Sequence, residues 1–136
     1  QIVSKVKVSK ENVFENILSV INGKIDFYDI TITYEDLIHE FSKEYRETFE
    51  KDAGELFKDR FPKWRDESIN VISQICSEDD ATMTNTIMKL QKDDGELKAY
   101  TGEFTLICSE RSYLLRFSAF ETNKNFYVSQ IVLPNN

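Results

Sequence analysis

The stretch DDGELKAYTGEFTLICSERSYLLRFSAFETNKNFYVSQIVL (residues 93–133) decides the fold. Apolar and polar side chains alternate through it between short polar turns, which is typical of antiparallel strands with one buried face. Asp93-Asp94-Gly95 is a strong hairpin-turn signal, and the Thr-, Met- and Ile-rich segment before it predicts one further strand. The pattern predicts a meander of about four strands, at 82–92, 97–109, about 113–119 and 126–133.

Two details of this sheet can be predicted. Gly102, inside a long strand, indicates a bulge or bend. In the last strand, strict alternation places Tyr127, Ser129, Ile131 and Leu133 on one side. Bulged, long strands curve strongly, so helices lying across such a sheet can enclose a conical cavity.

The first half of the chain has mostly helical apolar spacing. An edge strand is expected at Ile2–Val8, and an extended passage at Ile25–Thr33. Asp52-Ala53-Gly54 is expected to interrupt the helical pattern and Pro62 to end a helix. The helices are expected at about 9–22, 33–51, after 54 up to Pro62, and 64–76. Helices followed by strands indicate an α+β class, with N-terminal helices packed on a curved antiparallel sheet in a single domain, residues 1–136.

Composition excludes several classes of function. The chain has 136 residues, a formal net charge of −7 and a pI near 4.8, which argues against nucleic-acid binding. The longest apolar runs are too short for a membrane span. One histidine and two cysteines do not support a metal cluster, and no cofactor motif is present. The chain begins with Gln, so we expect any signal or anchor to lie upstream and to have been removed, which leaves an extracytoplasmic location open.

The closing strands carry a resemblance to a known family. Residues 102–108, 113–117 and 126–133, preceded by helices, resemble the nuclear transport factor two-like branch of the cystatin-like folds. The resemblance covers the last third of the chain. It implies helices on a strongly bent antiparallel sheet. Members of that superfamily include small-molecule isomerases and dehydratases as well as non-enzymatic dimerisation, secretion-scaffold and cell-envelope domains, so the fold does not fix the function.

Aromatic residues are the candidates for a ligand site. A pocket between helices and sheet, with apolar walls and a few hydroxyl groups, binds small molecules. The alternative is that these rings simply fill the core. The candidate ligand-binding residues are Trp64, Tyr100, Tyr113, Phe117 and Tyr127; Phe104 belongs to the same aromatic set.

Other chemically active side chains have simpler explanations. The single histidine, His39, lies off the apolar stripe of its helix and is expected in solvent. Asp26 and Asp29 flank two aromatic residues and could carry a raised pKa, but a surface loop explains them better. A disulfide between Cys76 and Cys108 is open if the protein is exported. The basic residues around Trp64, namely Arg60, Lys63 and Arg65, fit a solvated helix face better than an anion site.

Three hypotheses about function follow. The first is a non-enzymatic domain of the nuclear transport factor two-like type that binds a small apolar ligand or a protein, with a homodimer through the sheet as one form. The second is a small cavity enzyme, an isomerase or lyase, which uses a buried Asp with Tyr as acid and base. The third is a regulatory partner whose acidic surface meets a basic protein.

Overall fold

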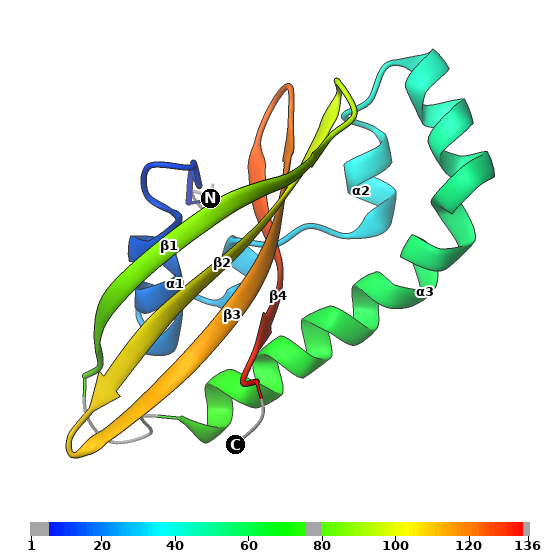
Figure 1. The fold of residues 1–136 in the computed structure, drawn as a ribbon. Coiled ribbons are helices and arrows are strands. Elements are labelled where there is room, and N and C mark those ends of the chain that lie inside the picture. Colours follow the sequence, from blue (N-terminus) through cyan, green and yellow to red (C-terminus); the bar gives the residue numbers. More distant parts are fainter. Residues whose placement is uncertain (1–5, 76–79, 135–136) are drawn as a thin grey trace, which may run out of the picture.

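The computed structural model describes residues 6–75 and 80–134. Figure 1 shows helices on one side of a curved sheet. The predicted α+β class, with N-terminal helices on a curved antiparallel sheet of four strands, is confirmed. The elements are α1 (Val13–Ile21), the 3-10 helix η1 (Phe27–Asp29), α2 (Tyr34–Ile38), α3 (Lys43–Gln74), β1 (Thr82–Asp93), β2 (Leu97–Cys108), β3 (Arg111–Thr122) and β4 (Phe126–Val132).

The strands form an antiparallel meander in the order β1-β2-β3-β4. The predicted first turn is confirmed: Gly95 has φ +91°, and the backbone N–H of Asp94 donates to the carbonyl of Leu97 at 2.9 Å. Of the predicted bulge or bend at Gly102, the bulge is wrong, because Gly102 pairs in regular register with both neighbouring strands. The register shifts lie instead in β1, between Thr84 and Ile87 and between Leu90 and Lys92, and in β4.

The bulge in β4 corrects the predicted face of that strand. Ser118 pairs with Gln130 and Ala119 with Val128, so Ser129 is an extra residue in the ladder. Because one extra residue reverses the inward and outward alternation, Val128 and Ile131 are both fully buried. The expectation that every second residue from Tyr127 to Leu133 shares one side is therefore wrong.

Gly102 has a packing role. A Cβ atom at this position would lie 2.3 Å from a ring carbon of Phe117. The ring of Phe117 lies in the space that a side chain would take, and it is almost fully buried. The glycine is therefore needed for close contact between β2 and the core. A glycine inside this strand thus indicates close packing against Phe117 of β3.

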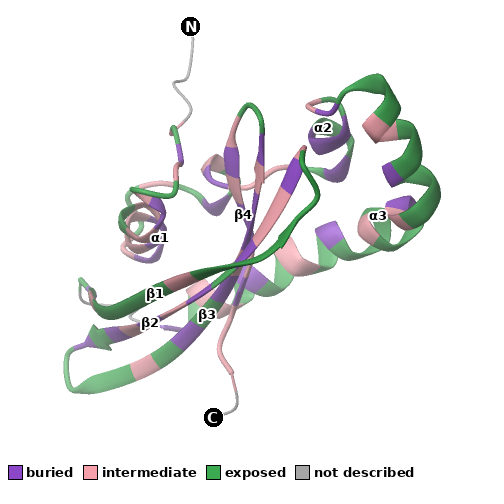
Figure 2. Ribbon diagram, turned by 45° about the horizontal axis from the view of Figure 1, so that its top comes forward, coloured by how far each residue is buried: buried purple, intermediate pink, exposed green. Residues whose placement is uncertain are grey.

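The two edges of the sheet differ. On β4, the backbone N–H of Val128 donates to the carbonyl of Ile30 at 2.8 Å, and that of Ile131 donates to the hydroxyl of Ser68 at 2.7 Å. Ser68 is fully buried in α3, and its own hydroxyl donates to the carbonyl of Trp64 at 2.7 Å. Figure 2 shows β1 exposed along nearly its whole length. The helices thus cover the edge at β4 and leave the edge at β1 open.

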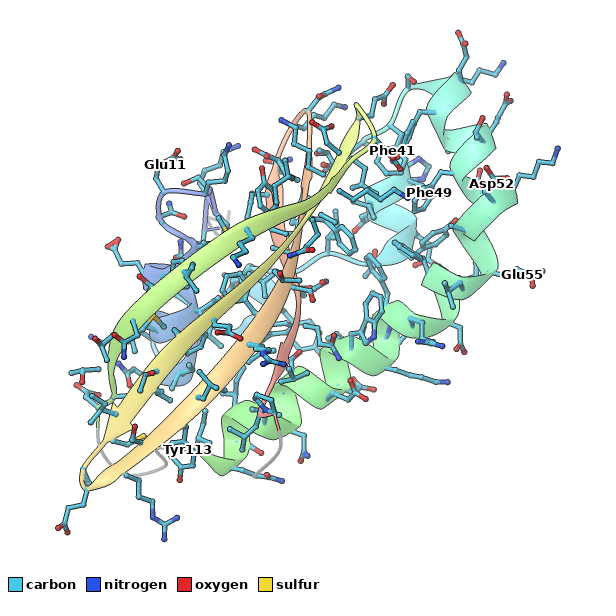
Figure 3. The ribbon with its side chains drawn as sticks, viewed as in Figure 1. Glu11, Phe41, Phe49, Asp52, Glu55 and Tyr113 are labelled. Atoms are coloured by element: carbon cyan, nitrogen blue, oxygen red, sulfur yellow. The ribbon has the colours of Figure 1, made fainter. Side chains whose placement is uncertain are left out.

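The long helix α3 corrects two predictions. It runs unbroken through Gly54 and contains Pro62. Pro62 and Lys58 are both exposed, so water can solvate the Lys58 carbonyl that loses its N–H partner. Because Gly54 has no side chain, the hydroxyl of Tyr34 can pack against it. A Cβ atom at position 54 would lie 2.9 Å from that hydroxyl oxygen. Figures 1 and 3 show α3 bent near the segment that carries Glu55, so that its first half curves around α2.

The N-terminal segments also differ from expectation. Helix α1 begins at Val13, and the predicted start at Ser9 is an isolated turn in which the Ser9 hydroxyl accepts from the Asn12 N–H at 3.3 Å. Residues 6–8 of the predicted edge strand are not part of the sheet, and residues 2–5 lie outside the described residues. The passage 25–33 contains η1. The predicted helix 33–51 is divided between α2 and α3, with Ser42 as the N-cap of α3.

The apolar interior has two parts. The larger cluster lies between α1 and the concave side of the sheet, and it includes Phe27, Phe104 and Phe117. The second cluster lies between α2, the first half of α3 and the hairpin end of the sheet, where Leu97 and Phe120 contribute from β2 and β3. The second cluster is rich in aromatic rings and borders the cleft described next.

Candidate functional site

A cleft of about 290 Å³ lies between the first half of α3 and the hairpin end of the sheet. Tyr45, Phe49, Ala53 and Phe57 recur every fourth residue along α3 and therefore share one helix face. The opposite wall comes from the ends of β1, β2 and β3. The lining side chains are Tyr45, Thr48, Phe49, Asp52, Ala53, Phe57, Lys92, Asp94, Leu97, Ala99 and Phe120.

The aromatic wall of the cleft is held by ring contacts. Phe49 meets Phe57 edge to face, with ring centroids 5.2 Å apart, and Phe57 lies 5.7 Å from Phe120. Tyr45 stacks on Phe49 at 6.1 Å and meets Phe41 at 4.7 Å. Because each ring packs against others, the wall keeps its shape without a ligand. Figure 3 shows Phe41 and Phe49 in the space between α3 and the hairpin end of the sheet.

Tyr45, which lines the cleft, carries a polar atom without a hydrogen-bond partner among the described residues. This atom is its buried hydroxyl oxygen. Burial raises the pKa of Tyr45 to about 12, and the carboxylates of Asp94 and Glu96 add to the shift, although Asp94 lies outside hydrogen-bonding geometry. Tyr45 is therefore a neutral phenol at any physiological pH. A buried polar atom of this kind is normally satisfied by water or by a ligand.

The rim of the cleft is charged. Lys92 and Asp94 form a loose ion pair, with 3.8 Å between the ammonium nitrogen and a carboxylate oxygen, and both side chains are well exposed. Asp52 has no ion-pair partner among residues 6–75 and 80–134. The partly buried Arg46, one position after Tyr45, has an unpartnered Nε atom but is not part of the lining. The three charged groups at the rim thus sum to one negative charge.

One end of the cleft is fixed by a contact between helix and hairpin. The Ser42 hydroxyl donates to the carboxylate of Glu96, and the Ser42 backbone N–H donates to the same carboxylate at 2.7 Å. These two hydrogen bonds lower the pKa of Glu96. The Ser42 oxygen also accepts from the Tyr45 N–H at 3.3 Å, so a single side chain caps α3 and connects it to the β1–β2 turn.

A second polar group lies outside the cleft, at the β3–β4 turn. Glu40, in the loop between α2 and α3, accepts hydrogen bonds from the hydroxyl of Tyr127, from the hydroxyl of Thr122 at 2.6 Å and from the side chain of Asn125 at 3.3 Å. Burial raises the pKa of Tyr127, and the hydrogen bond to Glu40 adds to the shift. Three donors occupy this carboxylate, which suits a structural connection between the helical layer and the sheet.

The five predicted ligand-binding residues are not gathered in one place. Trp64 packs on Phe57 and Phe61 in the second cluster, while Tyr100 and Phe117 lie in the core beneath the sheet. The Tyr100 hydroxyl donates to Glu121 at 2.6 Å, and that of Tyr127 donates to Glu40. Figure 3 places Tyr113 at the opposite end of the sheet from Phe49. None of the five is among the lining side chains of the cleft, and their role in binding stays a prediction.

The sequence contained a signal for the cleft that our interpretation did not use. Aromatic residues occur at 41, 45, 49, 57 and 61, and Ala53 fills the remaining place in this interval of four. This regular series predicts one continuous aromatic face. The face can be recognised only if residues 43–74 are interpreted as a single helix. Phe120 of β3 completes the wall, and its proximity depends on the tertiary fold.

The other candidates have structural explanations. His39 is exposed, as predicted. Asp26 and Asp29 form the reciprocal capping box of η1, where the Asp26 N–H donates to Asp29 at 2.9 Å. Lys63 pairs with Asp59 at 3.2 Å and Arg65 with Asp66 at 3.3 Å, so two of the three basic residues around Trp64 form ion pairs with carboxylates of their own helix.

Cys108, at the end of β2, is buried and disulfide-bonded. Cys76, the only other cysteine of the chain, lies outside the described residues, and so does most of the acidic stretch 77–80. Within the part of the chain that the structure describes, no group of three or more His, Cys, Asp or Glu side chains is arranged to hold a metal ion. Over the same residues, no helix combines the length and apolar character needed to cross a membrane.

Comparison with known proteins gives no family assignment: neither a protein-family profile nor a curated protein sequence matches the chain.

Proposed function

We propose that this chain is a non-enzymatic binding domain of the nuclear transport factor two-like type, which takes a small, mainly apolar ligand in the cleft between α3 and the sheet. The observation that carries the proposal is the wall of mutually packed rings around an open volume of about 290 Å³, with a polar rim and a single buried hydroxyl. Concave, apolar sites with few polar groups are typical of small-molecule binding.

The positions of the carboxylates favour binding over acid–base catalysis. Asp52 and Asp94 are exposed to water at the rim, so neither is a shielded carboxylate. The half-buried Glu40 and Glu121 accept hydrogen bonds from tyrosine hydroxyls and do not line the cleft. An isomerase or lyase of the kind considered above needs a shielded carboxylate within reach of the substrate. That hypothesis, like that of an acidic partner for a basic protein, has less support.

The ligand proposal can be tested with the neutral probe N-phenyl-1-naphthylamine, whose fluorescence rises when it leaves water. We expect saturable enhancement with the wild-type chain. Ala53→Leu adds three carbon atoms inside the cleft and should weaken the enhancement, whereas Lys51→Leu places the same side chain on the exposed side of α3 and should retain it. Equal enhancement by Ala53→Leu and wild type, at matched urea unfolding midpoints, would rule out the cleft as the site.

We also propose a homodimer through the convex face of the sheet, supported by a separate observation. Ile87, Ile107 and Leu114 are 51%, 40% and 46% exposed, and the register places them on the face away from the helices. Between them Arg116 and Glu103 form an ion pair of 2.7 Å. The exposed Lys89 adds one positive charge to the same face, so the face has no excess of negative charge in a chain of net charge −7, and a second copy can approach there without repulsion between carboxylates.

The dimer proposal predicts a concentration-dependent mass in sedimentation equilibrium. Leu114→Glu should shift the population to monomer, while Leu56→Glu, a change at an equally exposed leucine on α3, should leave it unchanged. A wild-type chain that stays monomeric at the highest accessible concentration would refute the dimer and leave the ligand proposal standing.

A further inference from the structure

The chemistry of the cleft also indicates the charge of its ligand, an inference that rests on the proposed binding function. Two carboxylates and one ammonium group line the rim. Lys92 forms its loose ion pair with Asp94 at 3.8 Å. Asp52 is the remaining charge at the rim, and it has no ion-pair partner among the described residues. A ligand that enters the cleft therefore passes a net negative rim in a chain whose net charge is −7.

The aromatic wall of the cleft, like its rim, favours a positively charged ligand. The face of an aromatic ring carries partial negative charge, so rings attract a cation placed within about 6 Å of their centroid and repel an anion. Two such cation–π contacts occur elsewhere in the structure. The Lys10 ammonium nitrogen lies 6.0 Å from the ring centroid of Tyr100, and the Arg65 guanidinium carbon lies 5.7 Å from that of Tyr28. No lysine or arginine of the described residues occupies such a position over Tyr45, Phe49 or Phe57.

We propose that the cleft selects an organic cation with a compact apolar body, which packs between the rings of α3 and Phe120 and holds its charge beside Asp52. The ring faces and the rim both attract a positive charge, and both would repel an anion. A neutral ligand would use the rings alone.

Three probes of nearly equal shape separate this proposal from the binding function itself. They are phenyltrimethylammonium, its neutral isostere tert-butylbenzene, and benzenesulfonate. Binding is followed by NMR titration of the Ala53 and Ala99 methyl groups, which both belong to the lining. We expect saturable shifts with the cation, weakening at high salt because the rim is exposed, and no saturable shifts with the anion.

Two variants should change the cation affinity in opposite directions. Asp52→Asn should weaken phenyltrimethylammonium binding about two- to fivefold, and Lys92→Gln should strengthen it by a similar factor, the range expected for exposed charges and cation–π contacts. Neither should change the affinity for tert-butylbenzene. The matched control is Glu55→Gln, on the same helix, whose side chain points away from the sheet (Figure 3).

The outcomes distinguish the two proposals. If tert-butylbenzene binds and the cation binds no better than benzenesulfonate, or if Asp52→Asn leaves the cation affinity unchanged, the charge preference is wrong and the apolar binding function stands. If none of the three probes shifts the Ala53 and Ala99 methyl groups, both proposals fail.

Discussion

The hydroxyl of Tyr127 in β4 donates a hydrogen bond to the carboxylate of Glu40, in the loop that joins α2 to α3. The contact connects residues 87 positions apart in the chain and fixes the helical layer to the β3–β4 turn. Tyr45 differs, since its buried hydroxyl has no hydrogen-bond partner among residues 6–75 and 80–134. The two tyrosines therefore form a matched pair for mutation.

Tyr127→Phe should lower the free energy of unfolding by about 1–2 kcal/mol, because the carboxylate of Glu40 loses one of its three donors in a half-buried place. Tyr45→Phe should change it much less, because the hydroxyl that it removes has no hydrogen-bond partner among the described residues. Urea unfolding followed by circular dichroism measures both. The assignment would be contradicted if the two variants were destabilised equally.

Gly102→Ala should destabilise the protein by about 2–3 kcal/mol, since the new methyl group would overlap the buried ring of Phe117. Phe117→Leu alone should also destabilise, because it leaves a cavity. The double variant should be more stable than the sum of the two losses predicts, as the smaller side chain makes room for the methyl group. Additive losses in a double-mutant cycle would show that the ring contact is not the reason for the glycine.

Alkaline pH should unfold the protein before tyrosine ionisation is complete. The pKa values of Tyr45 and Tyr100 are raised from 10.0 to about 12, and that of Tyr127 is raised as well, mainly by burial. Because these groups keep their protons longer in the folded state, their contribution is fully present below pH 10 and is lost between about pH 10 and 12. The urea midpoint should fall over this interval, and tyrosinate absorbance should lag behind that of a free-tyrosine standard.

The sheet was predictable because its signal is local. Buried and more exposed side chains alternate along 100–108 and 111–119 in the structure, and the predicted Asp93-Asp94-Gly95 turn forms. The helices were predictable in type but not in extent. Gly54 and Pro62 are helix breakers by propensity, yet α3 continues through both, because Tyr34 packs against Gly54 and Pro62 lies on the exposed side.

The candidate site was less predictable, since it depends on long-range contacts. Nothing local to Phe120 indicates that it meets Phe57, which lies 63 positions earlier in the chain. The bulge at Ser129 likewise follows from pairing with β3, and it changes which side chains of β4 face the core. Choosing aromatic residues by strand position therefore selected Tyr100 and Phe117, which are core residues.

The buried hydroxyl of Ser68 also bears on the behaviour of the protein at high concentration. By accepting the Ile131 N–H, it removes a donor that an incoming chain would need, and Ile30 does the same at Val128. Growth of the sheet by another chain is then confined to β1, where the register shifts break the row of regularly spaced amides. Any chain that extends this sheet must therefore pair with β1, and substitutions that favour or block such growth should act on that strand.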